Sequence, residues 1–151
     1  MAERGAQIYY KILTDDNIRP NCCDKWENKF GEVIKYNIVF KKIQNIKEIK
    51  LRWFQLRLIH RILATNVVLH GMGIKDTDVC SFCKQVKDSL QHMFWDCDIV
   101  GHFWQLFQTT INTICTQTNS IELNQQIIFF GYKENFRTVK IFDLILLHAK
   151  L

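Results

Sequence analysis

Four residues between positions 80 and 97 have the types and spacing of metal ligands. Cys80, Cys83, His92 and Cys97 form the pattern C-x2-C-x8-H-x4-C. Because two intervening residues make a tight turn, the sulfurs of Cys80 and Cys83 can reach the same ion. Three thiolates and one imidazole complete a tetrahedral shell and leave no position for a reacting water. The spacing therefore favours one structural zinc ion over a catalytic metal.

Two other interpretations of this cysteine cluster stay open. A redox-active disulfide between Cys80 and Cys83 is one, but such a motif usually opens a helix in a βαβ context, which the flanking sequence lacks. Buried free thiols are the other. The polar N-terminus is not a secretory signal, so we expect an intracellular protein, in which clustered cysteines more often bind metal. The remaining cysteines and histidines have no partner at ligand spacing, and we expect packed or exposed side chains at Cys22, Cys23, Cys115, His60, His70, His102 and His148.

Helices must position these ligands. Apolar residues recur at steps of three and four along much of the chain, so we expect a mainly α-helical fold, a single helical domain with a small CCHC segment stabilised by zinc. The clearest helix covers residues 46–63. Its predicted buried stripe is Ile46, Ile49, Trp53, Leu56, Ile59 and Leu63, with a second apolar edge at Leu51, Leu58 and Ile62.

Shorter helices are expected around the cluster. Thr65 can cap one over residues 66–70, and Ser89 can cap one that carries His92. A five-residue step is too wide for one helical face, so Cys97 should lie just past the end of that helix. Asp98 can cap a helix to residue 114, and a last helix is expected over residues 135–151.

Positive charge is concentrated directly before the cluster. The net charge of +5 is modest, but residues 41–61 hold seven basic side chains against Glu48 alone. Such a block is typical of phosphate binding, and a solvated helix face explains it equally well. The basic residues are Lys41, Lys42, Lys47, Lys50, Arg52, Arg57 and Arg61, of which Lys47, Lys50, Arg57 and Arg61 should share one stripe of the helix.

Catalytic patterns are missing from the sequence. Asp15 and Asp16 are adjacent carboxylates, but no third carboxylate or palm sheet accompanies them, and we interpret them as a helix end or turn. Phosphate-binding loops, dinucleotide fingerprints, nucleophile elbows and zinc-protease motifs are also missing. No apolar run reaches the length needed to span a bilayer. We therefore expect no enzymatic activity from this chain by itself.

Residues 51–104 resemble the zinc-binding domain that follows the reverse transcriptase domain in LINE-type (non-LTR) retrotransposons. The resemblance rests on the block WFQLRLIHRILATN, on MGI and CSFC, on the step H-x-F-W-x-C and on a later FW pair. Weaker likeness is present at IYYKIL, IIFFGY and IFDLILLHAK. The resemblance places Cys80, Cys83, His92 and Cys97 at the ligand positions of the family, with Ser89 where threonine is usual.

The resemblance also implies a domain organisation. Residues 1–45 would be a helical segment linking to a reverse transcriptase domain upstream, and residues 46–116 the zinc-binding domain itself. Residues 117–151 would be a C-terminal helical segment, truncated here. Proteins of this kind work on nuclear DNA and assemble with RNA in the cytoplasm, so nucleus and cytoplasm are the expected locations.

The predicted function is that of a non-catalytic accessory module that binds one Zn²⁺ and contacts RNA or DNA backbones through a basic helix. The expected contacts, with little sequence specificity, are Lys47, Lys50, Arg52, Arg57 and Arg61. Partners would be nucleic acid and the parent reverse transcriptase domain, with no membrane and no small-molecule substrate. The alternatives are a docking module that braces a polymerase domain and a retroelement fragment without function. Four aromatic residues could stack on bases, but we expect core positions for Trp53, Phe54, Phe82 and Trp95.

Overall fold

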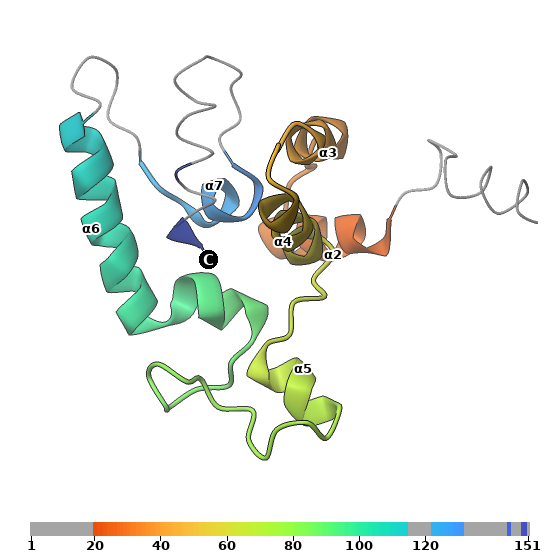
Figure 1. Ribbon diagram of the computed structural model, residues 1–151, viewed down its shortest axis with the longest axis vertical. Coiled ribbons are helices and arrows are strands. Elements are labelled where there is room, and N and C mark those ends of the chain that lie inside the picture. Colours follow the sequence, from red (N-terminus) through yellow and green to blue (C-terminus); the bar gives the residue numbers. More distant parts are fainter. Residues whose placement is uncertain (1–19, 115–121, 132–144, 146–148, 151) are drawn as a thin grey trace, which may run out of the picture. The chain divides into compact units, whose positions relative to one another are not determined.

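A computed structural model describes residues 20–114, 122–131, 145 and 149–150 (Figure 1). It divides the chain into two compact units, Met1–Ile38 and Val39–Leu151. The helices are α2 (Asn21–Phe30), α3 (Tyr36–Gln44), α4 (Ile49–Ile59), α5 (Asn66–Gly71), the π-helix η1 (His92–Asp96), α6 (Asp98–Ile114) and α7 (Gln125–Phe130). Across the described residues, β structure is confined to one antiparallel bridge between Val79 and Lys87. The predicted mainly helical fold is confirmed, whereas the predicted domain boundaries stay predictions.

The first unit contains α2 and two of the cysteines without ligand spacing. Cys22 and Cys23 are both buried in α2, and burial raises the pKa of the Cys22 thiol to about 11. The Tyr36 hydroxyl donates to the Cys23 carbonyl at 2.9 Å. The helix ends at Gly31, whose φ of 68° is a left-handed conformation that glycine adopts without strain.

Helix α4 buries most of the predicted second apolar edge and only part of the predicted main stripe. Leu51, Leu58 and Ile59 are fully buried, whereas Ile49 and Trp53 are 66% and 56% exposed. The predicted stripe is wrong at Ile49 and Trp53 and right at Ile59, and Leu51 and Leu58 of the predicted second edge are buried. Because both sides of this segment carry apolar residues, periodicity alone could not choose between them. The buried side includes Gln55, whose side-chain amide is satisfied inside the core, because its Nε2 donates to the Phe129 carbonyl at 2.6 Å.

Helix α4 is also shorter than the predicted 46–63. It ends in a Schellman motif, in which Ile62 N–H donates to the Arg57 carbonyl at 3.0 Å and Arg61 N–H to the Leu58 carbonyl at 3.1 Å. Arg61 takes the left-handed position, with φ of 60°, where glycine is usual. Lys47 precedes the first turn and Arg61 follows the last, so the four predicted basic residues do not form one helical stripe.

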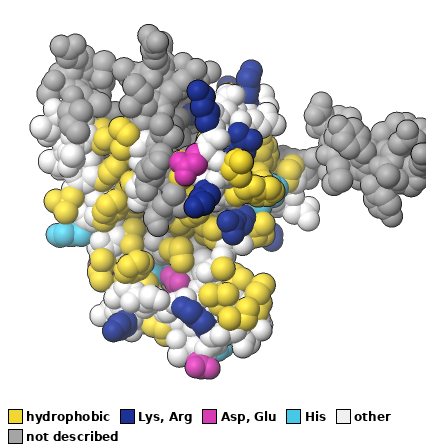
Figure 2. All heavy atoms as spheres, in the orientation of Figure 1, with side chains coloured by type: hydrophobic (Ala, Val, Ile, Leu, Met, Phe, Trp, Pro, Cys, Tyr) yellow, Lys and Arg dark blue, Asp and Glu magenta, His cyan; other side chains and the backbone are white. Residues whose placement is uncertain are grey.

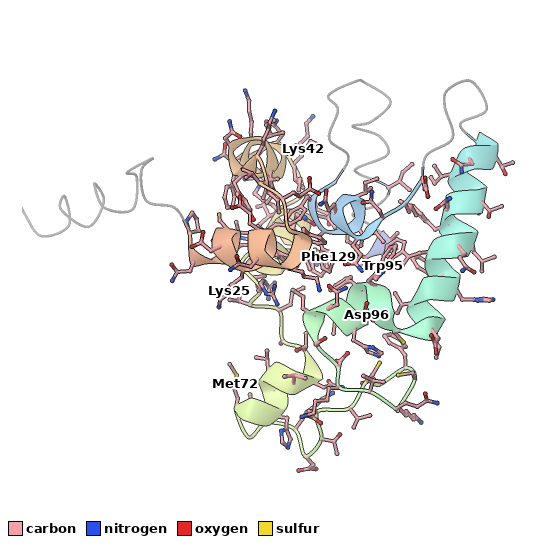
Figure 3. The ribbon with its side chains drawn as sticks, turned by 180° about the vertical axis from the view of Figure 1, so that it is seen from behind. Lys25, Lys42, Met72, Trp95, Asp96 and Phe129 are labelled. Carbon is pink, nitrogen blue, oxygen red and sulfur yellow. The ribbon has the colours of Figure 1, made fainter. Side chains whose placement is uncertain are left out.

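Aromatic packing joins α4, η1 and α7 around Phe94. The Phe94 ring meets Phe54 of α4 and Phe129 of α7 edge to face, with ring centroids 6.2 and 6.1 Å apart. Phe129, labelled in Figure 3, belongs to α7, and its ring contact with Phe94 joins this helix to η1. From α6, the Trp104 indole donates to the Phe94 carbonyl at 2.8 Å. The π-helix that carries His92 is therefore fixed by packing on one side and by a hydrogen bond on the other.

Several predictions fall outside the described residues. These are the turn at Asp15 and Asp16, most of the C-terminal helix, and the surroundings of Cys115 and His148. Of the helices that are described, none has the length and apolar character needed to cross a membrane.

Candidate metal centre

The structure brings the four predicted ligands together. One ligand atom from each of Cys80, Cys83, His92 and Cys97 lies within 4.8 Å of all the others. Cys80, His92 and Cys97 are buried, and Cys83 is half-buried. All three cysteines are free thiols, so the Cys80–Cys83 disulfide is not formed. The arrangement is a compact, largely buried cluster of three sulfurs and one imidazole nitrogen.

A tight loop presents the first two cysteines. The bridge between Val79 and Lys87 closes it, and Cys80 N–H donates to the Val86 carbonyl at 2.8 Å. Phe82 N–H donates to the Cys80 sulfur, 3.4 Å away, and this bond becomes stronger when Cys80 is ionised by a metal. The Phe82 side chain is 58% exposed at the end of this loop, so its predicted core position is wrong.

The π-helix η1 explains how His92 and Cys97 reach the same point. Cys97 N–H donates to the His92 carbonyl at 3.1 Å, which closes a five-residue turn. Cys97 lies just past the helix, as predicted. A five-residue step is too wide for an α-helix, but it matches one π-turn, and this was not foreseen. The Ser89 hydroxyl accepts from His92 N–H at 3.1 Å, so the predicted cap is confirmed. Figure 1 shows η1 as the green helix that leads into α6.

Asn66 connects the loop to α5, a role that was not predicted from the sequence. Its buried side-chain amide donates to the Val79 carbonyl at 2.7 Å and to the Ser81 hydroxyl at 3.0 Å. Its oxygen accepts from Lys75 Nζ at 2.6 Å. The backbone N–H of Asn66 donates to the buried Asp88 carboxylate at 3.0 Å. The Thr-Asn pair at the end of WFQLRLIHRILATN could have indicated this role. Thr65 was correctly predicted to cap the helix, but no role was predicted for Asn66.

The two cysteines of the loop differ in acidity. Hydrogen bonds from the backbone N–H groups of Gln85 and Val86 are the main cause that lowers the pKa of Cys83 to about 6. Burial is the main cause that raises the pKa of Cys80. In the metal-free protein, Cys83 is therefore largely a thiolate at neutral pH, and Cys80 must lose its proton when a metal binds.

This difference predicts selective alkylation. In the chelated protein, iodoacetamide should label Cys83 well before Cys80 or Cys97, because Cys83 combines a low pKa with partial exposure. The thiolate fraction falls as the pH falls through about 6, so the labelling rate of Cys83 should fall over the same range. Peptide mapping by mass spectrometry measures both effects. Equal labelling of the three cysteines would contradict the prediction, and labelling of metal-loaded protein is the control, in which all three should be protected.

The donor set fits a tetrahedral ion. Zinc–sulfur and zinc–nitrogen bonds of about 2.3 and 2.0 Å imply ligand–ligand distances of about 3.5 to 3.8 Å in a tetrahedron. Cys83 Sγ and His92 Nε2 are 3.3 Å apart, and no pair exceeds 4.8 Å. Closing the cluster around an ion therefore requires movements of about 1 Å or less at the side chains.

The predicted basic residues have different surroundings. Lys50 and Arg57 lie on the exposed side of α4, and Lys47 is exposed just before it. Arg52 instead is half-buried, and its Nε donates to the Ile46 carbonyl at 2.8 Å, which fixes the entry to α4. The role of Arg52 in nucleic-acid binding stays a prediction.

Comparison with known proteins identifies one related family. Residues 9–104 match a protein family described as zinc-binding in reverse transcriptase. The matched range contains α2 to η1 and all four residues of the metal cluster. No curated protein and no solved structure matches the chain.

Proposed function

Because the chain belongs to the family of zinc-binding domains of reverse transcriptases, we propose that it is a non-catalytic, zinc-stabilised module that binds nucleic acid for a LINE-type replicase. The observation that carries the proposal is the convergence of Cys80, Cys83, His92 and Cys97 within 4.8 Å. The partners are RNA or DNA and the parent reverse transcriptase domain. The places of action are the cytoplasm, where such proteins meet RNA, and the nucleus.

The zinc ion would be held by Cys80 and Cys83 of the loop, His92 of η1 and Cys97 directly after it. With four protein ligands the ion supplies structure, because no coordination position is left for a substrate. This chain's own residues link the site to the fold. Asn66 joins the loop to α5, and Trp104 joins η1 to α6. Metal binding would therefore fix the loop relative to α5 and α6.

The nucleic-acid surface consists of Lys47, Lys50 and Arg57. All three are exposed, and no ion pair involves them within residues 20–114. Figure 2 shows Lys and Arg side chains gathered around a hydrophobic patch in the region of α3 and α4. Cations without an acidic partner attract phosphates at long range and release counterions when they bind. We name this set the basic surface.

The test is a charge-matched pair of triple variants. Replacing Lys47, Lys50 and Arg57 with glutamine should weaken binding to RNA and DNA oligonucleotides of any sequence. The slope of log affinity against log salt should fall in magnitude by about 2 to 3, roughly one unit for each lost phosphate contact. The matched control replaces Lys25, Lys29 and Lys35, which are also exposed, and should leave both quantities nearly unchanged. Arg61 is left out because it forms the end of α4.

Equal affinity and equal slope in the two triple variants would refute the role of the basic surface. A docking module would then be favoured, and one observation supports that second candidate. Helix α6 exposes Ile99, Phe103 and Leu106, spaced by four and three residues and therefore on one side. Binding of the purified reverse transcriptase domain, lost on replacing Leu106 with glutamate, would support docking.

A further inference from the structure

The Trp53 side chain lies on the exposed side of α4. It is 56% exposed, and among the described residues its indole makes no hydrogen bond and no ring contact. Its sequence neighbour Phe54 packs against Phe94, and Trp104 donates its indole N–H to a carbonyl. A large exposed aromatic surface lowers solubility and contributes nothing to the core. Trp53 is therefore a candidate for contact with a ligand.

The neighbours of Trp53 on α4 define the chemistry of that ligand. Lys50 lies three residues before it and Arg57 four residues after it, so both stand beside it on the helix surface. Arg57 Nε donates to the Trp53 backbone carbonyl at 3.4 Å, which holds the guanidinium against the same turn of α4. Ile49, 66% exposed, extends the apolar area on the same side. An aromatic plane is thus flanked by two cations along one helix.

We infer that Trp53 is a stacking platform for an unpaired base, with Lys50 and Arg57 binding the phosphates on either side. The inference rests on the proposed function and specifies its substrate class as single-stranded nucleic acid. Bases in a duplex are stacked on one another and cannot cover the indole, whereas every unpaired base has a free aromatic face. A protein partner fits less well, because its apolar surface would leave both cations without counter-charges.

The experiment compares a single-stranded oligonucleotide with the duplex of the same sequence, using the full zinc-loaded chain. Trp53→Ala should weaken single-strand binding by about 5- to 150-fold and leave duplex binding unchanged within about twofold. Trp53→Phe keeps an aromatic face and should recover most of the single-strand affinity. Ile74→Ala, which removes another exposed apolar side chain, is the control and should bind both ligands like the parent chain.

The outcomes separate this inference from the proposed function. If the triple variant of the basic surface loses affinity for both ligands while Trp53→Ala loses neither, the platform is refuted and the basic surface stands. An equal loss on single strand and duplex in Trp53→Ala would also refute stacking. Quenching of tryptophan fluorescence by oligo(dT) gives an independent measurement. It should be markedly smaller in Trp53→Phe than in the parent chain, and unchanged quenching would overturn the inference.

Discussion

Replacing Cys97 with serine should abolish stoichiometric zinc binding and unfold the segment from Asp78 to Cys97. A serine hydroxyl is a far poorer zinc ligand than a thiolate. Zinc affinity should therefore fall by more than about 100-fold, which is more than the loss of a residue that only hydrogen-bonds to a ligand costs. The Cys97 side chain is buried, so no nearby solvent-exposed group can take its place without rearrangement. Unfolding should stay local. It removes the packing of Phe94 on Phe54 and Phe129, but Leu51, Leu58 and Ile59, the buried side chains of α4, lie outside the segment.

Elemental analysis and hydrogen exchange measure the two parts of this prediction. The parent chain should contain one zinc per molecule and protect the N–H groups of Cys80 and Cys97, both of which donate to backbone carbonyls. In Cys97→Ser the zinc content should approach zero, and both amides should exchange rapidly. The matched control is Cys22→Ser, which alters a buried thiol outside the cluster and should retain one zinc. Full zinc content in Cys97→Ser would show that the cluster is not the metal site.

The cluster could be predicted from the sequence because its geometry depends on residues that are close together in the chain. The C-x2-C spacing defines a turn, and the caps at Thr65 and Ser89 depend on hydrogen bonds three residues away. The π-turn between His92 and Cys97 could not be predicted in the same way. An α-helix and a π-helix require similar local residue types, and the choice here depends on contacts of η1 with α6 and α7.

The face of α4 could not be predicted either, for a different reason. Apolar residues occur all around this helix, and the decision depends on partners distant in sequence. Gln55, a polar residue, is buried because the Phe129 carbonyl, 74 residues away, accepts its hydrogen bond. Trp53, an apolar residue, is left outside. A prediction from apolar periodicity counts only hydrophobic residues, so it placed Trp53 in the core and left Gln55 out.

Replacing Asn66 with alanine should lower both the stability of the metal loop and its zinc affinity, because Asn66 makes the contacts that position this loop. The change removes three hydrogen bonds, to the Val79 carbonyl, the Ser81 hydroxyl and the Lys75 ammonium. At a net contribution of about 0.5 to 1.5 kcal/mol each, the free energy of unfolding of this region should fall by about 1.5 to 4.5 kcal/mol. Zinc affinity should fall by about 10- to 100-fold, as for other outer contacts of metal sites.

Competition with a chelator measures the zinc affinity, and hydrogen exchange at Asp88 N–H, which donates to the Asp78 carbonyl, measures the loop. Asn66→Asp is the sharper variant. It keeps an oxygen for Lys75 but places a second acceptor against the Val79 carbonyl, so it should weaken zinc binding at least as much as Asn66→Ala. Asn45→Ala, at an exposed position outside this network, should leave zinc affinity unchanged. If the zinc affinity of Asn66→Ala is within about twofold of that of the parent chain, the prediction is contradicted. The loop would then hold its ligands in place without α5, and the metal site would depend only on residues 78–97.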